Sequence, residues 1–337
     1  MNRMPTWLAT AFVAAMLASV PVGAQQPIVI KFSHVVAVDT PKGKGAEEFK
    51  KLAEERTKGR VKVEVYPNST LFKDREEIEA LQLGRVEMLA PSLSKFGPLG
   101  VTEFEVFDLP FLFDGYDALR RVTQGPVGRA LLEKLAPRGI VGLAYWDNGF
   151  KVFSANRPLR SPEDFRGLRM RIQPSRVLEA QMRALGAQPQ VLAFSDVAAA
   201  LKAGVVDGAE NPVSNLWTQR MNEVQRHVTL TAHGYLGYAA VVNKPFWDAL
   251  PRDVRSALAQ AMAEATEHAN RIARAKNEED LARLRAAGTT EVYDPTAAER
   301  RALRRALAPV HAQVEARIGG GLLREVYRAA GYDPGSP

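Results

Sequence analysis

Two arginines, two residues apart, stand in a short segment where apolar side chains alternate with basic ones. Arg169 and Arg171 are flanked by apolar residues from position 168 to 172, directly before Pro174. This pattern predicts a strand that leads into a helix. An arginine held at a strand end presents a planar fork that can donate two hydrogen bonds to one carboxylate. Because residues two apart share a strand face, alternation alone does not separate Arg171 from Arg169.

A second group of polar residues follows another expected strand. Residues 87–90 predict a short strand, and the loop after it contains Ser92 and Lys95. Open α/β sheets bind ligands at the carboxyl ends of their parallel strands. This loop is therefore a candidate part of the same binding site.

The first part of the chain predicts strands and helices in alternation. Alternating valines mark one strand, glycines mark helix ends, and Asp39-Thr40-Pro41 marks a helix start. This order predicts a parallel sheet with helices on both faces. The aromatic-rich segment 104–113 is interpreted as core. The expected strands are 28–32, 61–65, 87–90 and 140–145. The expected helices are one that follows Asp39-Thr40-Pro41 and ends at Gly59, one over 74–83 and one over 116–136.

A second unit of the same kind begins near Asn148. Its expected strands are 151–155, 169–172 and 190–192, with a helix start at Ser161, a helix over 177–185, and another that Ser195 caps and that ends at Gly204. A returning strand is expected over 238–243.

One long helix is expected from Pro251 to about Ala287. An apolar stripe runs along most of this segment. At 1.5 Å per residue it would span roughly 50 Å, which is longer than one small domain is wide. The helix should therefore bridge two domains.

The first 24 residues have the features of a secretory signal peptide. Arg3 precedes an apolar run from Trp7 to Val20, and small residues stand at the positions before an expected cleavage after Ala24. A retained membrane anchor is the alternative, but the run is shorter than the roughly 20 apolar residues that a bilayer requires. Cysteine is absent, which excludes disulfides, a thiolate metal site and a cysteine nucleophile. No metal site and no cofactor are expected.

The chain is basic, with a net charge of +7 that falls to +6 when the leader with Arg3 is removed. Positive charge raises the local concentration of an anionic ligand. Lysines and arginines are interleaved with acids and form no continuous basic stripe, which argues against a nucleic-acid-binding protein. The sequence also lacks HExxH, G-x-S-x-G and a phosphate-binding glycine loop, so an enzyme is not expected.

The order and spacing of several segments resemble the substrate-binding proteins of tripartite ATP-independent periplasmic (TRAP) transporters, and most of all the DctP-type branch that binds C4-dicarboxylates. The resemblance covers essentially the whole chain after the leader. The segments that carry it are KFSHVVAVDTPKGKGAEEFK, APSLSKFGPLGVTEFEVFDLPFLF, WDNGFKVFSANRPL, RGLRMRIQPS, DGAENP and TAHGYLGYAAVVNKPFWDALP.

This resemblance implies an α/β fold of two lobes, each a β-sheet flanked by helices, with one long helix across both. It places residues 25–147 and 237–276 in lobe I and residues 148–236 and 277–337 in lobe II.

The resemblance also implies roles for individual residues. It selects Arg171 over Arg169 as the arginine that holds the ligand carboxylate, and it makes Asn211 an amide donor to the same carboxylate. An Asx turn before Pro212 is the structural alternative for Asn211. Lys151 and Lys95 fall at ligand-contact positions of relatives. Lysine at position 151 departs from the arginine of sugar-acid binders, which puts bidentate geometry in doubt and keeps charge complementarity.

Four further residues are weaker candidates for ligand contact. Ser92 could donate its hydroxyl, Phe194 could form an apolar wall, and Tyr238 could reach a carboxylate oxygen. His34 is more easily explained as a loop residue that makes a structural hydrogen bond, because no partner pattern accompanies it.

The expected function follows from these residues and from the resemblance. The protein should be a periplasmic solute-binding protein that closes on malate, succinate or fumarate and delivers it to TRAP membrane subunits, and a sensor kinase is an alternative partner. Two other functions stay open. One is the same fold with a different ligand, such as a 2-oxo acid or an aromatic acid, and the other is an exported enzyme that processes carboxylates.

Overall fold

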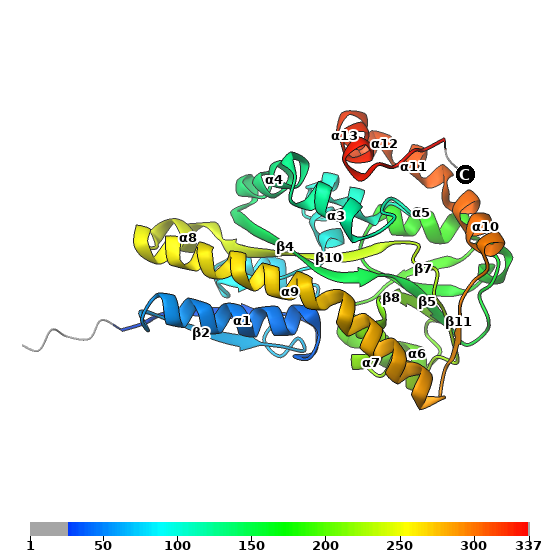
Figure 1. Ribbon diagram of the computed structural model, residues 1–337, viewed down its shortest axis with the longest axis horizontal. Coiled ribbons are helices and arrows are strands. Elements are labelled where there is room, and N and C mark those ends of the chain that lie inside the picture. The colour runs from blue at the N-terminus through cyan, green and yellow to red at the C-terminus, as the bar shows by residue number, and fades with distance from the viewer. Residues whose placement is uncertain (1–25, 336–337) are drawn as a thin grey trace, which may run out of the picture.

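A computed structural model describes residues 26–335, which fold around two β-sheets (Figure 1). The expected signal peptide, residues 1–24, lies outside the described residues. The five-stranded sheet has the order β2-β1-β3-β10-β4, and the six-stranded sheet has the order β11-β9-β5-β8-β6-β7. The five-stranded sheet, which contains β1 to β4, forms lobe I, and the sheet that contains β5 to β9 forms lobe II.

The predicted parallel pairing of the first three strands is confirmed, and the returning strand β10 makes the sheet of lobe I mixed. Strand β1 pairs in parallel with β2 and β3, but β10 pairs antiparallel with both β3 and β4. Strand β10 returns from lobe II through a short connection, so no crossover helix aligns it with its neighbours. The strands are β1 (Ile28–Ser33), β2 (Val61–Tyr66), β3 (Met88–Leu89), β4 (Ile140–Phe150) and β10 (Tyr235–Asn243).

The sheet of lobe II is also mixed. Strand β6 pairs in parallel with β7 and β8, while β5 pairs antiparallel with β8 and β9. Parallel pairing places the ends of β6 and β8 at one edge of the sheet. The strands are β5 (Val152–Ala155), β6 (Arg169–Ile172), β7 (Gln188–Val191), β8 (Gly208–Asn211), β9 (His227–Thr229) and β11 (Glu291–Tyr293).

Two chain segments cross between the sheets side by side. Strand β4 passes through Lys151 into β5, and residues 230–234 connect β9 to β10. Lys151 N donates to Gly234 O at 2.8 Å, so the two crossings are hydrogen-bonded to each other. Any rotation of one lobe against the other must bend these segments.

Helix α1 begins as the sequence predicts. The Thr40 side chain accepts a hydrogen bond from Gly43 N, and Pro41 occupies the first turn. A Cβ at position 43 would collide with the carbonyl oxygen of Val38, so only glycine lets the loop after β1 fold back on the helix. This arrangement turns the start of α1 toward the centre of the molecule.

The long helix α9 (Arg252–Ala287) confirms the predicted bridge. It packs against α1 and β4 of lobe I and against α7 and β11 of lobe II, and Figure 1 shows it along most of the molecule. Its buried face begins at Val254 and Leu258 and continues to Leu284. One rigid element therefore contacts both lobes.

Three predicted helices differ from the structure. The expected helix over 116–136 is two helices, α3 and α4, because Gly125 and Pro126 interrupt the hydrogen-bond ladder. The expected helix over 74–83 is limited to α2, six residues long. Ser195 lies inside a 3-10 turn instead of capping a helix.

The remaining helices complete the layers around the sheets. The α-helices are α1 (Pro41–Arg56), α2 (Glu77–Gln82), α3 (Tyr116–Thr123), α4 (Pro126–Glu133), α5 (Arg176–Ala184), α6 (Val197–Lys202), α7 (Val213–Thr218), α8 (Lys244–Ala249), α10 (Ala297–Leu307), α11 (Pro309–Gln313), α12 (Glu315–Ile318) and α13 (Gly320–Ala330). The 3-10 helices are η1 (Leu93–Phe96), η2 (Thr102–Asp108), η3 (Ala136–Arg138), η4 (Pro162–Phe165), η5 (Phe194–Asp196) and η6 (Met221–Glu223).

The aromatic-rich segment 104–113 is core, as predicted. Phe104 and Phe107 are fully buried, with ring centroids 6.4 Å apart. Among the C-terminal helices, α12 and α13 contact η2 of this segment. Helix α13 also contacts α3 and α4, while α10 and α11 contact α5. The lobe boundaries inferred from the resemblance stay a prediction.

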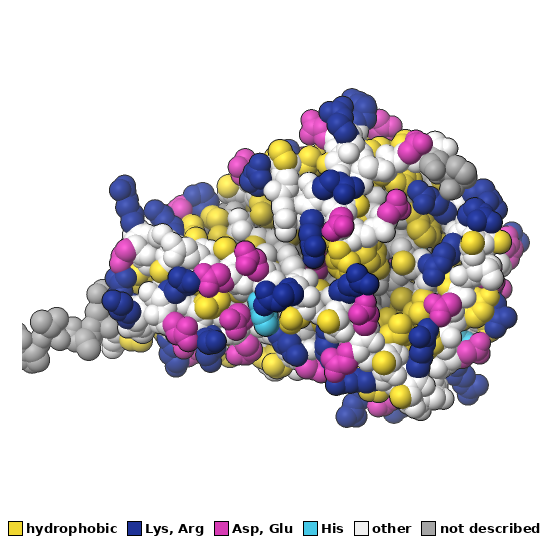
Figure 2. Space-filling view, viewed as in Figure 1, with side chains coloured by type: hydrophobic (Ala, Val, Ile, Leu, Met, Phe, Trp, Pro, Cys, Tyr) yellow, Lys and Arg dark blue, Asp and Glu magenta, His cyan; other side chains and the backbone are white. Residues whose placement is uncertain are grey.

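The surface mixes both signs of charge over the face drawn in Figure 2. Lys and Arg are distributed among Asp and Glu there. No helix between residues 26 and 335 combines the length and the apolar character that a membrane span requires.

A buried carboxylate beside the crossing strands generates a first prediction. Asp147 on β4 is buried, and it accepts a hydrogen bond from Tyr235 Oη at 2.6 Å. Its Oδ2 has no partner among residues 26–335. Burial raises the pKa of Asp147 to about 6, although the Tyr235 hydrogen bond opposes this shift.

A carboxyl group whose pKa is raised by folding destabilises the folded state when it is ionised. This cost is present above about pH 6 and disappears as the pH falls toward the value in the unfolded chain. Asp147→Asn keeps an acceptor for Tyr235 and should raise the free energy of unfolding by about 2 to 3 kcal/mol near pH 7.5, with the difference vanishing near pH 4. Urea denaturation at both pH values measures this change. A variant less stable than wild type near pH 7.5 would contradict the prediction.

Candidate functional site

A cavity of about 20 Å³ lies between the two lobes. This volume holds about one water molecule, so the lobes are closed on each other. The cavity is lined from lobe I, from lobe II and from the crossing strand β10. Its lining residues are Val35, Val36, Lys42, Asp74, Ser92, Lys95, Gln173, Phe194, Asn211, Asn215, Leu236 and Tyr238.

Arg171 lies immediately beside this cavity and is 1% exposed. Its Nε and Nη2 donate to the carbonyl oxygen of Leu192 at 3.1 and 2.9 Å, and its guanidinium carbon is 5.9 Å from the ring centroid of Phe194. Burial lowers the pKa of Arg171, and the nearby Asp74 and Glu210 oppose this shift. A buried guanidinium held by a carbonyl retains donors for a carboxylate ligand.

Arg169, the alternative arginine, points elsewhere. Its Nη2 lies 2.7 Å from Asp207 Oδ1, and its side chain is 43% exposed. The two arginines share one strand face, but only Arg171 turns into the interior. Residue spacing did not distinguish them, and the resemblance did.

Asp74 links the lobes directly. Its Oδ2 accepts a hydrogen bond from Phe194 N at 2.6 Å, and its other oxygen accepts from Lys95 Nζ. Burial by itself would raise the pKa of Asp74, but Lys95 and Arg171 outweigh it and lower the pKa to about 2. This carboxylate therefore carries its charge in the closed cleft and joins residues of both lobes.

Lys95 lines the cavity, as predicted, but two carboxylates hold its ammonium group. Its Nζ forms ion pairs with Asp74 and with Glu77, and Glu77 is 1% exposed. Burial favours a lower pKa for Lys95, yet these two acids together raise it. The charge of Lys95 is thus already neutralised within lobe I.

Lys42 is a cavity residue that the sequence analysis missed. It lies in the first turn of α1, 1% exposed, and its Nζ donates to Ala90 O at 3.0 Å. The same atom lies 3.8 Å from the ring centroid of Tyr238. Burial lowers the pKa of Lys42 to about 7, although Glu77 opposes the shift. No carboxylate oxygen lies within 4.0 Å of Lys42 Nζ among the described residues, so Lys42 forms no salt bridge there.

A signal for Lys42 was present in the sequence. The residue follows the loop at the carboxyl end of β1, which is the sheet edge where open α/β folds bind ligands. Gln173 and Asn215 were missed as well, and both line the cavity. The Oδ1 atom of Asn215 is buried without a hydrogen-bond partner within residues 26–335.

Lys151 does not line this cavity. Its Nζ lies 2.6 Å from Glu210 Oε1, and the other oxygen of Glu210 is 2.9 Å from His233 Nε2. Burial by itself would raise the pKa of Glu210, but Lys151 and His233 lower it to about 2. The structure therefore places Lys151 in an ion pair between the crossing segment and β8.

Four other predicted contact residues line the cavity. Asn211, at the end of β8, lines it and has its Nδ2 3.7 Å from Met221 Sδ. Tyr238 lines it and accepts a hydrogen bond from Asn148 Nδ2 at 3.1 Å. Ser92 and Phe194 also line it, and Ser92 Oγ lies 3.1 Å from Ser94 Oγ.

His34 is buried outside the cavity wall. Neither ring nitrogen has a hydrogen-bond partner among the described residues. Burial, with the nearby Lys42, lowers the pKa of His34 to about 3. The imidazole is therefore neutral, and it lies near Lys42.

The cavity thus has more positive than negative charge. Arg171, Lys42 and Lys95 carry the cations, and Asp74 and Glu77 are the carboxylates close to them. A cation from each lobe without a tight carboxylate partner suits an anion with two charged ends.

Comparisons with known proteins identify the family and the fold of the chain. The family model described as bacterial extracellular solute-binding protein, family 7 matches residues 32–317. The chain is 63% identical over 311 residues to the C4-dicarboxylate-binding periplasmic protein DctP of Rhodobacter capsulatus, which covers 92% of this chain and 93% of that protein. These matches confirm the resemblance seen in the sequence.

Two solved structures have the same fold. A TRAP periplasmic solute-binding protein from Sulfurospirillum deleyianum with bound succinate has a TM-score of 0.88 and 44% identity, covering 90% of this chain and 100% of that one. Another from Pseudomonas aeruginosa with bound L-malate has a TM-score of 0.83 and 49% identity, covering 85% of this chain and 100% of that one.

Replacing the two cavity lysines should change the free energy of unfolding by different amounts. Lys95→Met leaves two buried carboxylates without their partner and should lower the free energy of unfolding by about 3 to 5 kcal/mol. Lys42→Met is the matched control, since it removes a buried ammonium that no carboxylate balances, and it should change stability by no more than about 1 kcal/mol. Urea denaturation of the ligand-free proteins measures both. Equal losses for the two variants would contradict the assignment of Lys95 to a structural ion pair.

Proposed function

This chain belongs to family 7 of the bacterial extracellular solute-binding proteins, and we propose that it captures a C4-dicarboxylate such as malate, succinate or fumarate between its lobes. The observation that carries this proposal is a pair of buried cations at one closed cavity: Lys42 of lobe I lines it, and Arg171 of lobe II lies beside its wall residue Phe194. A dicarboxylate can neutralise both at once.

Arg171 and Asn211 form the first half of the proposed site. Arg171 Nε and Nη2 already contact Leu192 O, which fixes the plane of the guanidinium. The remaining donors and the amide of Asn211 can bind one carboxylate. The resemblance assigns these two residues the same roles.

Lys42, Tyr238 and Ser92 form the second half. Lys42 Nζ is held by Ala90 O and by the face of Tyr238, so its charge is fixed in position. A second ligand carboxylate would supply the counter-charge that the protein lacks there. The unpaired Asn215 Oδ1 can accept a hydrogen bond from a ligand hydroxyl, which would favour malate.

The energies suit a binding protein. A charge-assisted hydrogen bond contributes about 1.5 to 3 kcal/mol net, and micromolar affinity requires about 8 kcal/mol. Four to six such bonds would suffice after the cost of association is subtracted.

Closure of the lobes is the proposed capture step. The ligand binds residues of both lobes, so it favours the closed population. Bending would occur at the crossing segments through Lys151 and residues 230–234, which α9 accompanies. The hydrogen bond from Phe194 N to Asp74 adds a contact that forms only when the lobes meet.

The location and the partner follow from the family. We infer that the mature protein acts in the periplasm and delivers its ligand to TRAP membrane subunits. A sensor kinase is an alternative recipient. Enzymatic turnover is not proposed, because the buried charged groups around the cavity are held in ion pairs or hydrogen bonds that suit ligand binding.

Arg171→Ala should reduce affinity for succinate and malate by at least a hundredfold, because it removes the charged donors for one carboxylate. Arg169→Ala is the matched control on the same strand and should keep wild-type affinity. Isothermal titration of the mature protein, freed of carried-over ligand by unfolding and refolding, measures both variants against malate, succinate, fumarate and pyruvate.

The pattern of affinities tests the ligand class. Tight binding of the dicarboxylates with no binding of pyruvate supports the two-cation site, and Lys42→Met should then weaken succinate binding at least tenfold. Retained affinity in Arg171→Ala would refute the site. Binding of pyruvate alone would replace the dicarboxylate with a 2-oxo acid, and turnover of a C4 acid would revive the enzyme hypothesis.

A further inference from the structure

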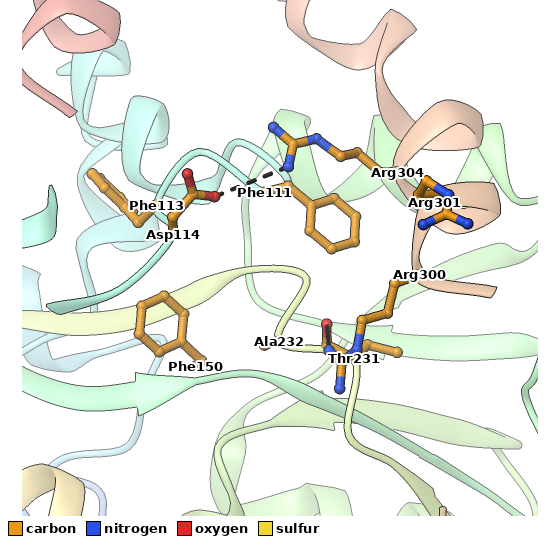
Figure 3. Close-up of a pocket in the computed structure, with 9 residues that line it drawn as sticks. All are labelled: Phe111, Phe113, Asp114, Phe150, Thr231, Ala232, Arg300, Arg301 and Arg304. Atoms are coloured by element: carbon orange, nitrogen blue, oxygen red, sulfur yellow. Dashed lines mark hydrogen bonds and ion pairs between the residues drawn. The ribbon is translucent and has the colours of Figure 1, made fainter. Parts of the chain in front are cut away.

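A second cavity, of about 270 Å³, lies on the outer side of the crossing segments (Figure 3). It is bounded by the end of β4, the loop 231–232, the loop 111–114 and helix α10. None of its lining residues lines the cavity between the lobes. It is therefore separate from the proposed dicarboxylate site.

Arginines dominate the polar part of this cavity. Arg300, Arg301 and Arg304 line it from the start of α10, and Asp114 is the single acid among the lining residues. Arg304 Nη1 is 4.0 Å from Asp114 Oδ1, at the limit of an ion pair, and the Asp114 side chain is 78% exposed. Three cations thus face one weakly engaged carboxylate.

At least one N–H donor of these arginines has no hydrogen-bond partner among the described residues. Arg304 Nε is buried and has no hydrogen-bond partner among the residues that the structure describes. Arg300 Nη1 donates to Thr231 O at 3.0 Å, which fixes its guanidinium beside the cavity. A buried unpaired donor on a cation is costly and is satisfied best by an anionic acceptor.

The rest of the wall is aromatic. Phe111, Phe113 and Phe150 line the cavity, and Figure 3 shows the rings of Phe113 and Phe150 on the side away from α10 and the ring of Phe111 beside Arg304. In Figure 2 hydrophobic side chains gather between α3 and α10, with Lys and Arg side chains around them. The cavity therefore offers one charged side and one apolar side.

The backbone around the cavity is held in an uncommon conformation. Phe111 has φ of 54° and Ala232 has φ of 48°, in the left-handed region that non-glycine residues rarely adopt. Phe111 N donates to His233 O at 2.8 Å, so the two loops support each other. Strained residues of this kind cluster at binding sites.

We propose that this second cavity binds a small aromatic carboxylate. The carboxylate would accept hydrogen bonds from Arg304 and Arg300, and the ring would pack against the phenyl side chains. The volume is sufficient, since a cavity of about 150 Å³ holds a benzene ring. The apolar wall favours an aromatic anion over inorganic phosphate or a C4-dicarboxylate, which would leave it uncovered.

The test is a ¹⁹F NMR titration of the mature protein with 4-fluorobenzoate in the presence of saturating succinate. Saturable one-to-one binding is expected, and the Arg171→Ala variant should bind 4-fluorobenzoate as well as wild type does. Loss of binding in Arg171→Ala would place the aromatic acid in the cleft between the lobes and overturn the proposal. The two sites are thereby tested independently.

Variants of α10 test the residues. Arg304→Gln and Arg300→Gln should each weaken 4-fluorobenzoate binding at least tenfold, while Arg305→Gln, an exposed neighbour on the same helix that does not line the cavity, should not. An equal loss in Arg305→Gln would overturn the assignment. The neutral 4-fluorobenzyl alcohol should bind wild type at least tenfold more weakly, and equal affinity would refute anion recognition even if a variant fails to fold.

Discussion

Enclosing a cation between two lobes is costly unless a carboxylate pairs with its charge. This constraint organises the centre of the molecule. Lys95 meets the requirement within lobe I through Asp74 and Glu77, and Lys151 meets it through Glu210. Lys42 and Arg171 remain without a tight carboxylate partner among the described residues. We propose that a dicarboxylate ligand supplies the negative charge that they lack, which would give both affinity and a reason for the lobes to stay closed.

The crossing segments must bend when one lobe rotates against the other. They are joined by the Lys151 N to Gly234 O hydrogen bond and by the chain of contacts from Lys151 through Glu210 to His233 and Thr231. Asn211 follows Glu210 directly, so the same strand end holds the ion pair of Glu210 and the proposed ligand contact of Asn211. The second cavity lies against Thr231 and Phe150, on the opposite side of these crossings.

Much of the fold could be predicted because its signals are local. Period-two alternation placed β6 at residues 169–172, and helix-start and glycine signals placed α1 and α9 within a few residues. The errors also have physical causes. The Gly125-Pro126 break was overlooked in a helical pattern, and Ser195, predicted to cap a helix, lies inside a 3-10 turn.

The sequence by itself determined most of the elements and the family, because propensities, caps and motif order are written in neighbouring residues. The resemblance also selected Arg171 for the proposed ligand contact. Only the tertiary structure decided which cations are still free to bind an anion. Lys95 is neutralised by residues 18 and 21 positions away, and Lys151 by one 59 positions away. Lys42 became a candidate only after folding buried it beside Tyr238, with Glu77 close enough to oppose its pKa shift but beyond salt-bridge distance. Long-range ion pairing depends on how distant segments meet, so no local pattern could reveal it.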